Sequence, residues 1–312
     1  MICRKQEIIC PDRLLEQARR VEPVRTAVIG ADSSLALQSA RLAQEAGIVE
    51  PVLIGSPGGI REKAAEIGWS VDTVAIEPAA DEREAAARGA RLAAEGRVGA
   101  IMKGHVHTDT LMAAIFGEKS LRTGRRMSHV FHLTVPHSER PLLITDAALN
   151  IAPDLETKKA IIANAVDLCH SLGMEEPKIA VLSASETPHP RMPSSMEAKA
   201  LTEWAAESVP GASALGPVAF DNVVSREAAL IKGIDHPVAG DADVVVVPSI
   251  ECGNALFKMM VYFMGACAAG VVLGGRIPVM LTSRADDPAA RLGSAALAVI
   301  AARGAESGHA GC

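Results

Sequence analysis

Polar side chains suited to binding and activating an anionic substrate are concentrated in LTSRADDP at residues 281–288. The stretch follows an apolar run typical of a strand and ends in a proline, which favours the first position of a helix. The guanidinium of Arg284 could hold a phosphate group, and the hydroxyl of Ser283 could donate a hydrogen bond to developing negative charge. Asp286 or Asp287 could act as a general base, although Asp287 is also expected to be the N-cap of the following helix.

A second polar stretch, KGHVHTDT at 103–110, also lies where a predicted strand ends. Ligands of open α/β sheets bind at the carboxyl ends of strands, so Lys103, His107 and Thr108 are candidate substrate contacts. Thr108 or Asp109 could instead cap the next helix. The two histidines make a weak metal site because no third ligand accompanies them, and we expect no metal.

Three arginines surround a glycine in RTGRRMSH at 122–129, just before another predicted strand. Clustered guanidinium groups suit phosphate recognition because their planar N–H donors match phosphate oxygens. We take Arg126, and with it Ser128 in the same stretch, as candidate substrate contacts. A solvated basic turn is the alternative.

The stretch TDAALNIAPD at 145–154 spans a predicted strand-to-loop transition. Asp146 and Asn150 flank this transition, and Asp154 is expected to cap the next helix. Taken alone, these residues indicate turn chemistry. Asn150 is nevertheless a candidate substrate contact because of the family resemblance described below.

In PSIECGNALFK at 248–258 a strand ends and a helix is expected to open near Gly253 and Asn254. Free N–H groups at a helix N-terminus bind phosphates, and glycine lets a ligand approach the backbone closely. Both residues are therefore candidate substrate contacts. An ordinary strand-to-helix turn is the alternative, since neither a complete GxGxxG nor a P-loop pattern is present.

Composition limits the classes of function. The 312 residues are 49% hydrophobic, which suffices for a packed core and favours two domains. A net charge of −6 argues against a general nucleic-acid binder. The six cysteines are scattered without CxxC spacing, and we find no signal peptide or membrane-spanning run. We therefore expect a cytoplasmic protein that binds neither nucleic acid nor membrane.

Strand-like and helix-like runs alternate almost throughout, which indicates an α/β protein with a parallel sheet covered on both faces. Strands are expected at residues 25–30, 51–55, 71–76, 99–104, 178–184 and 243–249. Helices are expected at residues 33–46, 81–95 and 155–172. The runs 127–136 and 141–149 are expected to form a hairpin. No Gly/Ser linker separates two halves, so one domain is expected to be discontinuous.

Together the five stretches resemble the phosphate acetyltransferase and phosphate butyryltransferase family in spelling and order. The matching sequences are KGHVHT, TGRRMSHV, TDAALNIAPDL, PVAGDADVVVVPSIECGNALFK and PVMLTSRADD. The resemblance implies a two-domain α/β protein with an isocitrate/isopropylmalate dehydrogenase-like fold and a cleft between the domains. The first, discontinuous domain would comprise residues 1–139 and 268–312, and the second residues 140–267. Family members are typically homodimers.

The resemblance also implies the reaction acyl-CoA + phosphate = acyl phosphate + CoA, with an acetyl or butyryl group. Coenzyme A is a substrate here, and no cofactor is required. The thiolate of CoA attacks the acyl carbonyl directly in a ternary complex, so no cysteine is expected to be the nucleophile. We assign Arg284 to phosphate, Ser283 to transition-state charge, and Asp286 or Asp287 to the base.

The finer pattern is similar to the butyryltransferase branch. Acetyl-specific members carry an arginine on the helix after the Gly-Asn pair, where this chain has Tyr262, and a catalytic Asp where it has Ala290. Tyr262 is therefore a candidate substrate contact, with core packing as its alternative role. Two other functions are considered: a non-catalytic module that binds acyl-CoA or acyl phosphate, and, less favoured, a dehydrogenase of the same fold.

Overall fold

The computed structural model describes residues 7–136, 138, 140–281 and 286–309, with side chains to residue 304. The chain divides into two compact units. We call Arg126–Ala268 the central unit, and Ile8–Arg125 with the chain from Ala269 onward the terminal unit. The terminal unit is therefore discontinuous in sequence.

The strands of the terminal unit lie in the order β3-β2-β1-β4-β11-β10. All neighbouring pairs from β3 to β11 are parallel, and β10 and β11 are antiparallel. The strands are β1 (Val24–Ile29), β2 (Val49–Gly55), β3 (Ala75–Pro78), β4 (Ala100–Lys103), β10 (Cys267–Leu273) and β11 (Val279–Met280). The strand–helix alternation of the sequence thus correctly predicts an α/β fold.

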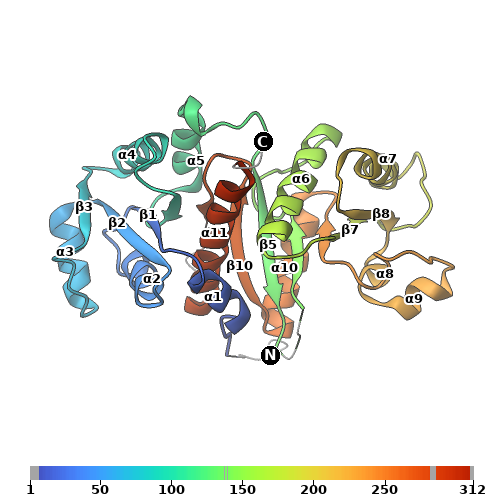
Figure 1. The fold of residues 1–312 in the computed structure, drawn as a ribbon, viewed down its shortest axis with the longest axis horizontal. Coiled ribbons are helices and arrows are strands. Elements are labelled where there is room, and N and C mark those ends of the chain that lie inside the picture. The colour runs from blue at the N-terminus through green and yellow to red at the C-terminus, as the bar shows by residue number, and fades with distance from the viewer. Residues whose placement is uncertain (1–6, 137, 139, 282–285, 310–312) are drawn as a thin grey trace. The chain divides into compact units, whose positions relative to one another are not determined.

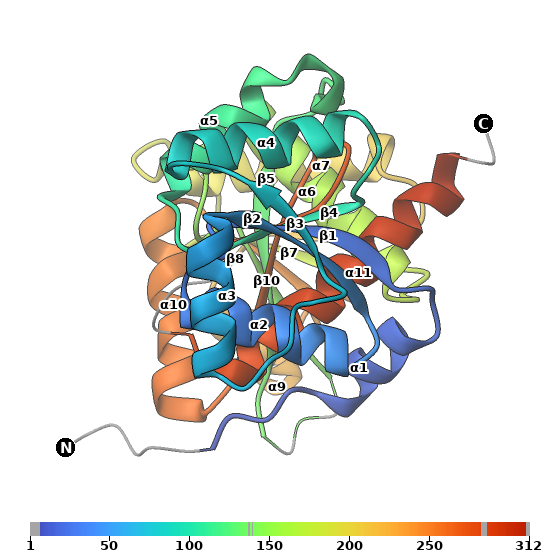
Figure 2. The same ribbon diagram turned by 90° about the vertical axis from the view of Figure 1, so that its left-hand side faces the viewer.

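Helices cover both faces of these strands, as Figure 2 shows for α4 and α5 on one face and α2 and α11 on the other. The helices of this unit are α1 (Asp12–Arg19), α2 (Ser34–Glu45), α3 (Pro57–Glu66), α4 (Glu82–Ala94), α5 (Thr108–Gly117) and α11 (Pro288–His309), with a 3-10 turn at Lys119–Leu121. Small residues allow α4 to pack closely: a Cβ atom on Gly89 would lie 2.0 Å from Cδ1 of Ile29 in β1.

The strands of the central unit lie in the order β5-β6-β9-β7-β8. The first pair is the predicted antiparallel hairpin, and the remaining pairs are parallel. The strands are β5 (Ser128–Thr134), β6 (Leu142–Thr145), β7 (Lys178–Leu182), β8 (Ser213–Val218) and β9 (Val244–Val246). The carboxyl ends of the parallel strands β6, β9 and β7 therefore share one edge of the sheet.

Two groups of helices lie on opposite faces of this sheet (Figure 1). On one face are α6 (Leu155–Ser171) and α7 (Pro193–Ser208). On the other are α8 (Phe220–Val224), α9 (Arg226–Ile231) and α10 (Ile250–Met264), and Val223 and Met260 there join a core cluster with strand residues.

Local sequence explains most helix boundaries. Ser33, Asp81 and Asp154 each accept a hydrogen bond from a backbone N–H in the first turn of α2, α4 and α6. The C-cap of α6 is Leu172, and Gly173 follows it with a φ of 82°.

Several predicted boundaries are wrong. The strands expected at 141–149 and 243–249 end earlier, at Thr145 and Val246. The strand expected from residue 71 begins at Ala75, because Val74 N–H bonds to the Val71 carbonyl in a turn. The helix expected to open near Gly253 begins at Ile250.

Candidate active site

Two glycines bring together the loops that follow β1 and β4. The Gly104 N–H donates to the Ile29 carbonyl at 2.8 Å, and a Cβ atom on Gly104 would lie only 2.6 Å from that oxygen. Gly30 has a φ of 67°, and a Cβ atom there would lie 2.6 Å from the His105 carbonyl oxygen. The backbone segments that follow the carboxyl ends of β1 and β4 are therefore in direct contact. Lys103, the last residue of β4, lies beside this contact.

His107 and Thr108 lie at the start of α5. The N-cap is His107, without a side-chain cap bond, so the alternative that Thr108 or Asp109 caps this helix is wrong. Nδ1 of His107 lies 2.8 Å from Oε2 of Glu82 on α4. Hydrogen bonds from Thr110, which has the larger effect, and from His107 lower the pKa of the Glu82 carboxyl to about 2. Glu82 is not among the site residues predicted from the sequence, because it lies 25 residues from His107 in the chain.

The loop after β6 is organised by the buried carboxylate of Asp146. It accepts hydrogen bonds from the backbone N–H groups of His129, Ala148, Leu149 and Asn150 and from the Asn150 side-chain amide. Both carboxylate oxygens are occupied by these donors. Asp146 is therefore an anchor for this loop rather than a base.

The buried hydroxyl of Ser128 points toward α6 and accepts a hydrogen bond from Nδ2 of Asn164 at 2.8 Å. Asn164 also donates to the Arg126 carbonyl oxygen at 3.0 Å. Asn164 is not among the site residues predicted from the sequence. An asparagine in the otherwise apolar run IIANAV was the available signal, because buried amides need hydrogen-bond partners.

The N-terminus of α10 lies against the same loop. The Ile250 N–H donates to the Ile151 carbonyl at 3.1 Å, and Glu251 adds a carboxylate to the first turn. Gly253 is buried against Ala147, and Nδ2 of Asn254 lies 3.5 Å from the Ala147 carbonyl oxygen. The close approach that Gly253 permits in the structure is thus between α10 and the Asp146 loop.

Replacing Gly253 should measure the importance of that approach. A Cβ atom there would lie 2.8 Å from the Ala147 Cβ and 3.0 Å from its Cα, so one backbone must shift. We expect Gly253→Ala to lower the free energy of unfolding by about 1–3 kcal/mol in urea titrations. Gly58→Ala in α3 is the matched control, because no atom lies within 4 Å of the new methyl group. Equal stabilities of the two variants would contradict this explanation.

Tyr262 lies near the C-terminal end of α10 and is 52% exposed. Its neighbours Met259, Phe263 and Met264 are also about half exposed. The alternative that Tyr262 is a buried core residue is therefore wrong. Its contact with the substrate stays a prediction.

The segment around the Ser-Arg pair is only partly described. Ser283 and Arg284 lie outside the described residues. Oδ1 of Asp287 accepts a hydrogen bond from the Ala289 N–H at 2.9 Å at the start of α11, which confirms its capping role. The Asp286 carbonyl accepts a hydrogen bond from the buried Arg291 guanidinium.

Cys252 is half-buried in the first turn of α10, and burial raises the pKa of its thiol. A nucleophilic cysteine needs the opposite shift, because the thiolate is the reactive form. We expect Cys252→Ala to retain most of the activity, measured as kcat/KM for acyl-CoA. An inactive but folded variant, or an acyl group trapped on this cysteine, would show that the thiol takes part.

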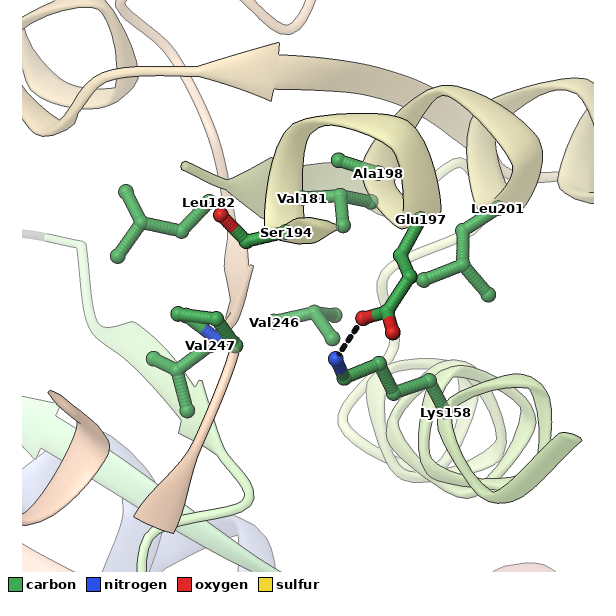
Figure 3. A pocket seen from close by; sticks show the side chains of 10 residues that line it. Lys158, Val181, Leu182, Ser194, Glu197, Ala198, Leu201, Val246 and Val247 are labelled. Carbon is green, nitrogen blue, oxygen red and sulfur yellow. Dashed lines mark hydrogen bonds and ion pairs between the residues drawn. The ribbon is translucent and has the colours of Figure 1, made fainter. Parts of the chain in front are cut away.

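A shallow depression, open to solvent, lies beside the carboxyl ends of β7 and β9 (Figure 3). Its floor is apolar, with Val181 and Val246 among the lining residues. Nζ of Lys158 enters it but already pairs with the Glu197 carboxylate. The depression therefore offers no unpaired cation to a phosphate group.

Within the described part of the chain, no cluster of three or more His, Cys, Asp or Glu side chains is arranged to hold a metal ion. No helix in that part is long and apolar enough to cross a membrane.

Comparison with known proteins identifies relatives over nearly the whole chain. Residues 81–299 match the family model described as Phosphate acetyl/butaryl transferase. The chain is 44% identical to a phosphate acetyltransferase of Rhizobium meliloti, with 93% of this chain and 92% of the relative covered. It is 34% identical to a phosphate butyryltransferase of Clostridium acetobutylicum, with 93% and 97% covered. The crystal structure of a branched-chain phosphotransacylase from Enterococcus faecalis V583 superposes with a TM-score of 0.78 at 31% identity, covering 89% of this chain and 99% of that one.

The fold and these relatives define an α/β acyltransferase. The chain belongs to the phosphate acetyl/butyryltransferase family, as the five sequence stretches predict.

Proposed function

We propose that this enzyme transfers an acetyl or butyryl group between CoA and phosphate by direct attack in a ternary complex. The observation that carries the proposal is the family match over residues 81–299, which contains all five polar stretches in order. In the direction from acyl phosphate, a base removes the proton of the CoA thiol, the thiolate attacks the acyl carbonyl, and phosphate leaves. The thiol has a pKa of about 8.5, so a carboxylate base assists at neutral pH.

The roles of the residues follow from their chemistry. Arg284 binds the phosphate group, Ser283 stabilises charge in the transition state, and Asp286 or Asp287 is the base. The remaining candidate contacts are Lys103, His107, Thr108, Arg126, Ser128, Asn150, Gly253, Asn254 and Tyr262. Because the raised pKa of Cys252 disfavours a thiolate on the protein, it supports direct attack over an acyl-enzyme.

We further propose that the two compact units correspond to the domains of an isocitrate/isopropylmalate dehydrogenase-like fold with a substrate cleft between them. The discontinuity of the terminal unit supports this division. We propose a homodimer, supported by four exposed apolar side chains at the end of α10: Met259, Tyr262, Phe263 and Met264. We also propose that the enzyme is cytoplasmic and needs neither metal nor redox cofactor.

Release of free CoA from acetyl-CoA and butyryl-CoA, measured with and without phosphate, tests the reaction. The proposal predicts phosphate-dependent release together with formation of acyl phosphate. Tight binding of acyl-CoA without turnover would instead identify a non-catalytic module. Reduction of a nicotinamide cofactor in the presence of a hydroxy acid would identify a dehydrogenase.

The enzyme should prefer acyl chains longer than acetyl, because Tyr262 replaces the arginine of acetyl-specific members. An additional methylene in an apolar pocket contributes roughly 1 kcal/mol or more, so kcat/KM for butyryl-CoA should exceed that for acetyl-CoA by about fivefold or more. Tyr262→Arg should shift the ratio toward acetyl-CoA, and Leu230→Arg on α9, which also replaces an exposed apolar side chain but lies outside α10, is the control. An unchanged ratio would show that Tyr262 does not determine chain length.

A further inference from the structure

The side chain of Arg126 is tethered by an amide. Its Nε–H donates to Oδ1 of Asn150 at 3.2 Å, although 24 residues separate the two in sequence. Arg126 is exposed, whereas Asn150 is only 6% exposed. An exposed arginine normally samples many rotamers, and holding one of them costs side-chain entropy. A buried acceptor at Nε restricts the guanidinium before any ligand arrives.

The acceptor is itself fixed on its other side. Nδ2 of Asn150 donates to the Met127 carbonyl at 2.9 Å and to Oδ2 of Asp146 at 2.8 Å. These bonds assign the amide orientation, because a flipped amide would place its oxygen against two acceptors. Oδ1 must therefore face Arg126. Donation to a carboxylate also polarises the amide and strengthens Oδ1 as an acceptor.

The Asp146 carboxylate is held in place by its hydrogen bonds. Four backbone N–H groups and one amide donate to its carboxylate, as described above, and it is 2% exposed. The main chain of Arg126 is held as well, because Asn164 donates to its carbonyl oxygen at 3.0 Å. Two buried amides thus fix both the backbone and the side chain of one exposed cation.

We propose that Asn150 is a positioning residue, which holds Arg126 so that its terminal guanidinium nitrogens receive a phosphate group of a substrate. The inference rests on the proposed function. It changes the role of Asn150, which would act on the substrate through Arg126 and not by direct contact. The chemistry is that of a phosphate oxyanion, supplied either by inorganic phosphate or by the phosphates of CoA.

A double-mutant cycle tests the proposal. Arg126→Ala, Asn150→Ala and the double variant are compared by kcat and by KM for phosphate and for butyryl-CoA. We expect Arg126→Ala to raise one KM about tenfold or more, Asn150→Ala to raise the same KM less, and the double variant to match Arg126→Ala. The KM that changes identifies phosphate or CoA as the bound anion.

Asn222→Ala is the matched control, because Asn222 is also a fully buried amide of the central unit and donates to Glu186, away from Arg126. Thermal unfolding of every variant separates lost stability from lost binding. Fold-changes in KM that multiply in the double variant would overturn the proposal, since Asn150 would then act independently. So would unchanged KM values in Arg126→Ala with active wild-type enzyme. Wild-type protein without turnover would instead refute the proposed function.

If Asn150→Ala does not fold, Arg126→Lys provides the second test. Lysine keeps the charge but has no Nε–H for the tether, and Asn150 retains its bonds to Met127 and Asp146. The proposal predicts that this variant loses affinity for the same substrate as Arg126→Ala. Wild-type KM values for both substrates in Arg126→Lys would overturn it.

Discussion

Lowering the pH from 7 to about 5 is expected to reduce the stability of the folded protein through two buried histidines. His129 and His132 are 0% and 5% exposed. Burial lowers the pKa of each imidazole from 6.5 to about 4. For His129 the nearby Asp146 carboxylate acts in the opposite direction but does not outweigh burial. Neither ring nitrogen of His129, nor Nδ1 of His132, has a hydrogen-bond partner among the described residues.

The sign follows from proton uptake. Between about pH 6.5 and 4 the unfolded chain binds protons that the folded imidazoles reject, so the free energy of unfolding falls as the pH falls and then levels off. One pKa unit corresponds to about 1.4 kcal/mol, so each histidine contributes roughly 2 kcal/mol of lost stability at pH 5. The pKa of Asp241 is lowered, chiefly by its hydrogen bond with Lys178. Its stabilising contribution is therefore lost only below about pH 4. The pH range in which the histidines lower the stability therefore lies above the range in which Asp241 does so.

Urea unfolding at pH 7 and at pH 5 measures this effect. His129→Phe and His132→Phe should each reduce the difference between the two pH values, because phenylalanine takes up no proton. His105→Ala, which removes an exposed imidazole, should leave the difference unchanged. If neither phenylalanine variant changes the pH dependence, these histidines are not its source.

The sequence predicts strands β1 and β2 of the terminal unit well because their residues face helices on both sides. Val28, Ile29, Leu53 and Ile54 are fully buried, and runs of this kind leave little doubt about strand identity. Strand β8 is missed because Gly216 and Pro217 interrupt its apolar pattern. Such a segment becomes a strand by pairing with β7, a contact that its own residues do not indicate.

The start of α10 shows how tertiary packing overrides local propensity. Glycine is a poor helix former, so Gly253 is typical of a helix boundary rather than an interior position. In the structure Gly253 lies inside the first turn of α10. A glycine is required there because a larger residue would collide with Ala147. That contact spans more than 100 residues of sequence, so the motif alone could not identify it.

Candidate polar stretches can be found in the sequence, but their connections cannot. The stretches with Arg126 and Asn150 are both evident as motifs, yet the bond between their side chains depends on how β5 and β6 pair. The pairing of His107 with Glu82 likewise depends on the packing of α4 against α5. The same limit explains why two buried histidines in SHVFH were not recognised as titrating groups.

Arg284→Ala is expected to have the largest effect on catalysis. Both substrates are anionic, so the reaction needs cations that offset their repulsion, and we propose that this guanidinium binds the phosphate. Loss of one partner of a buried charged hydrogen bond costs about 2–5 kcal/mol, or roughly 30- to several thousandfold in kcat/KM for phosphate. Phosphate-dependent release of CoA from butyryl-CoA is the measurement, and thermal unfolding confirms that the variant is folded.

Two comparisons make this result specific to the guanidinium. Arg61→Ala removes an exposed arginine on α3 and should leave kcat/KM near the wild-type value. Arg284→Lys keeps the charge but loses the bidentate fork, so it should recover only part of the activity. A folded Arg284→Ala variant with near-normal kcat/KM for phosphate would remove Arg284 from the active site. The phosphate would then have to be held by other cations, of which Arg126, tethered to Asn150, is the first to test.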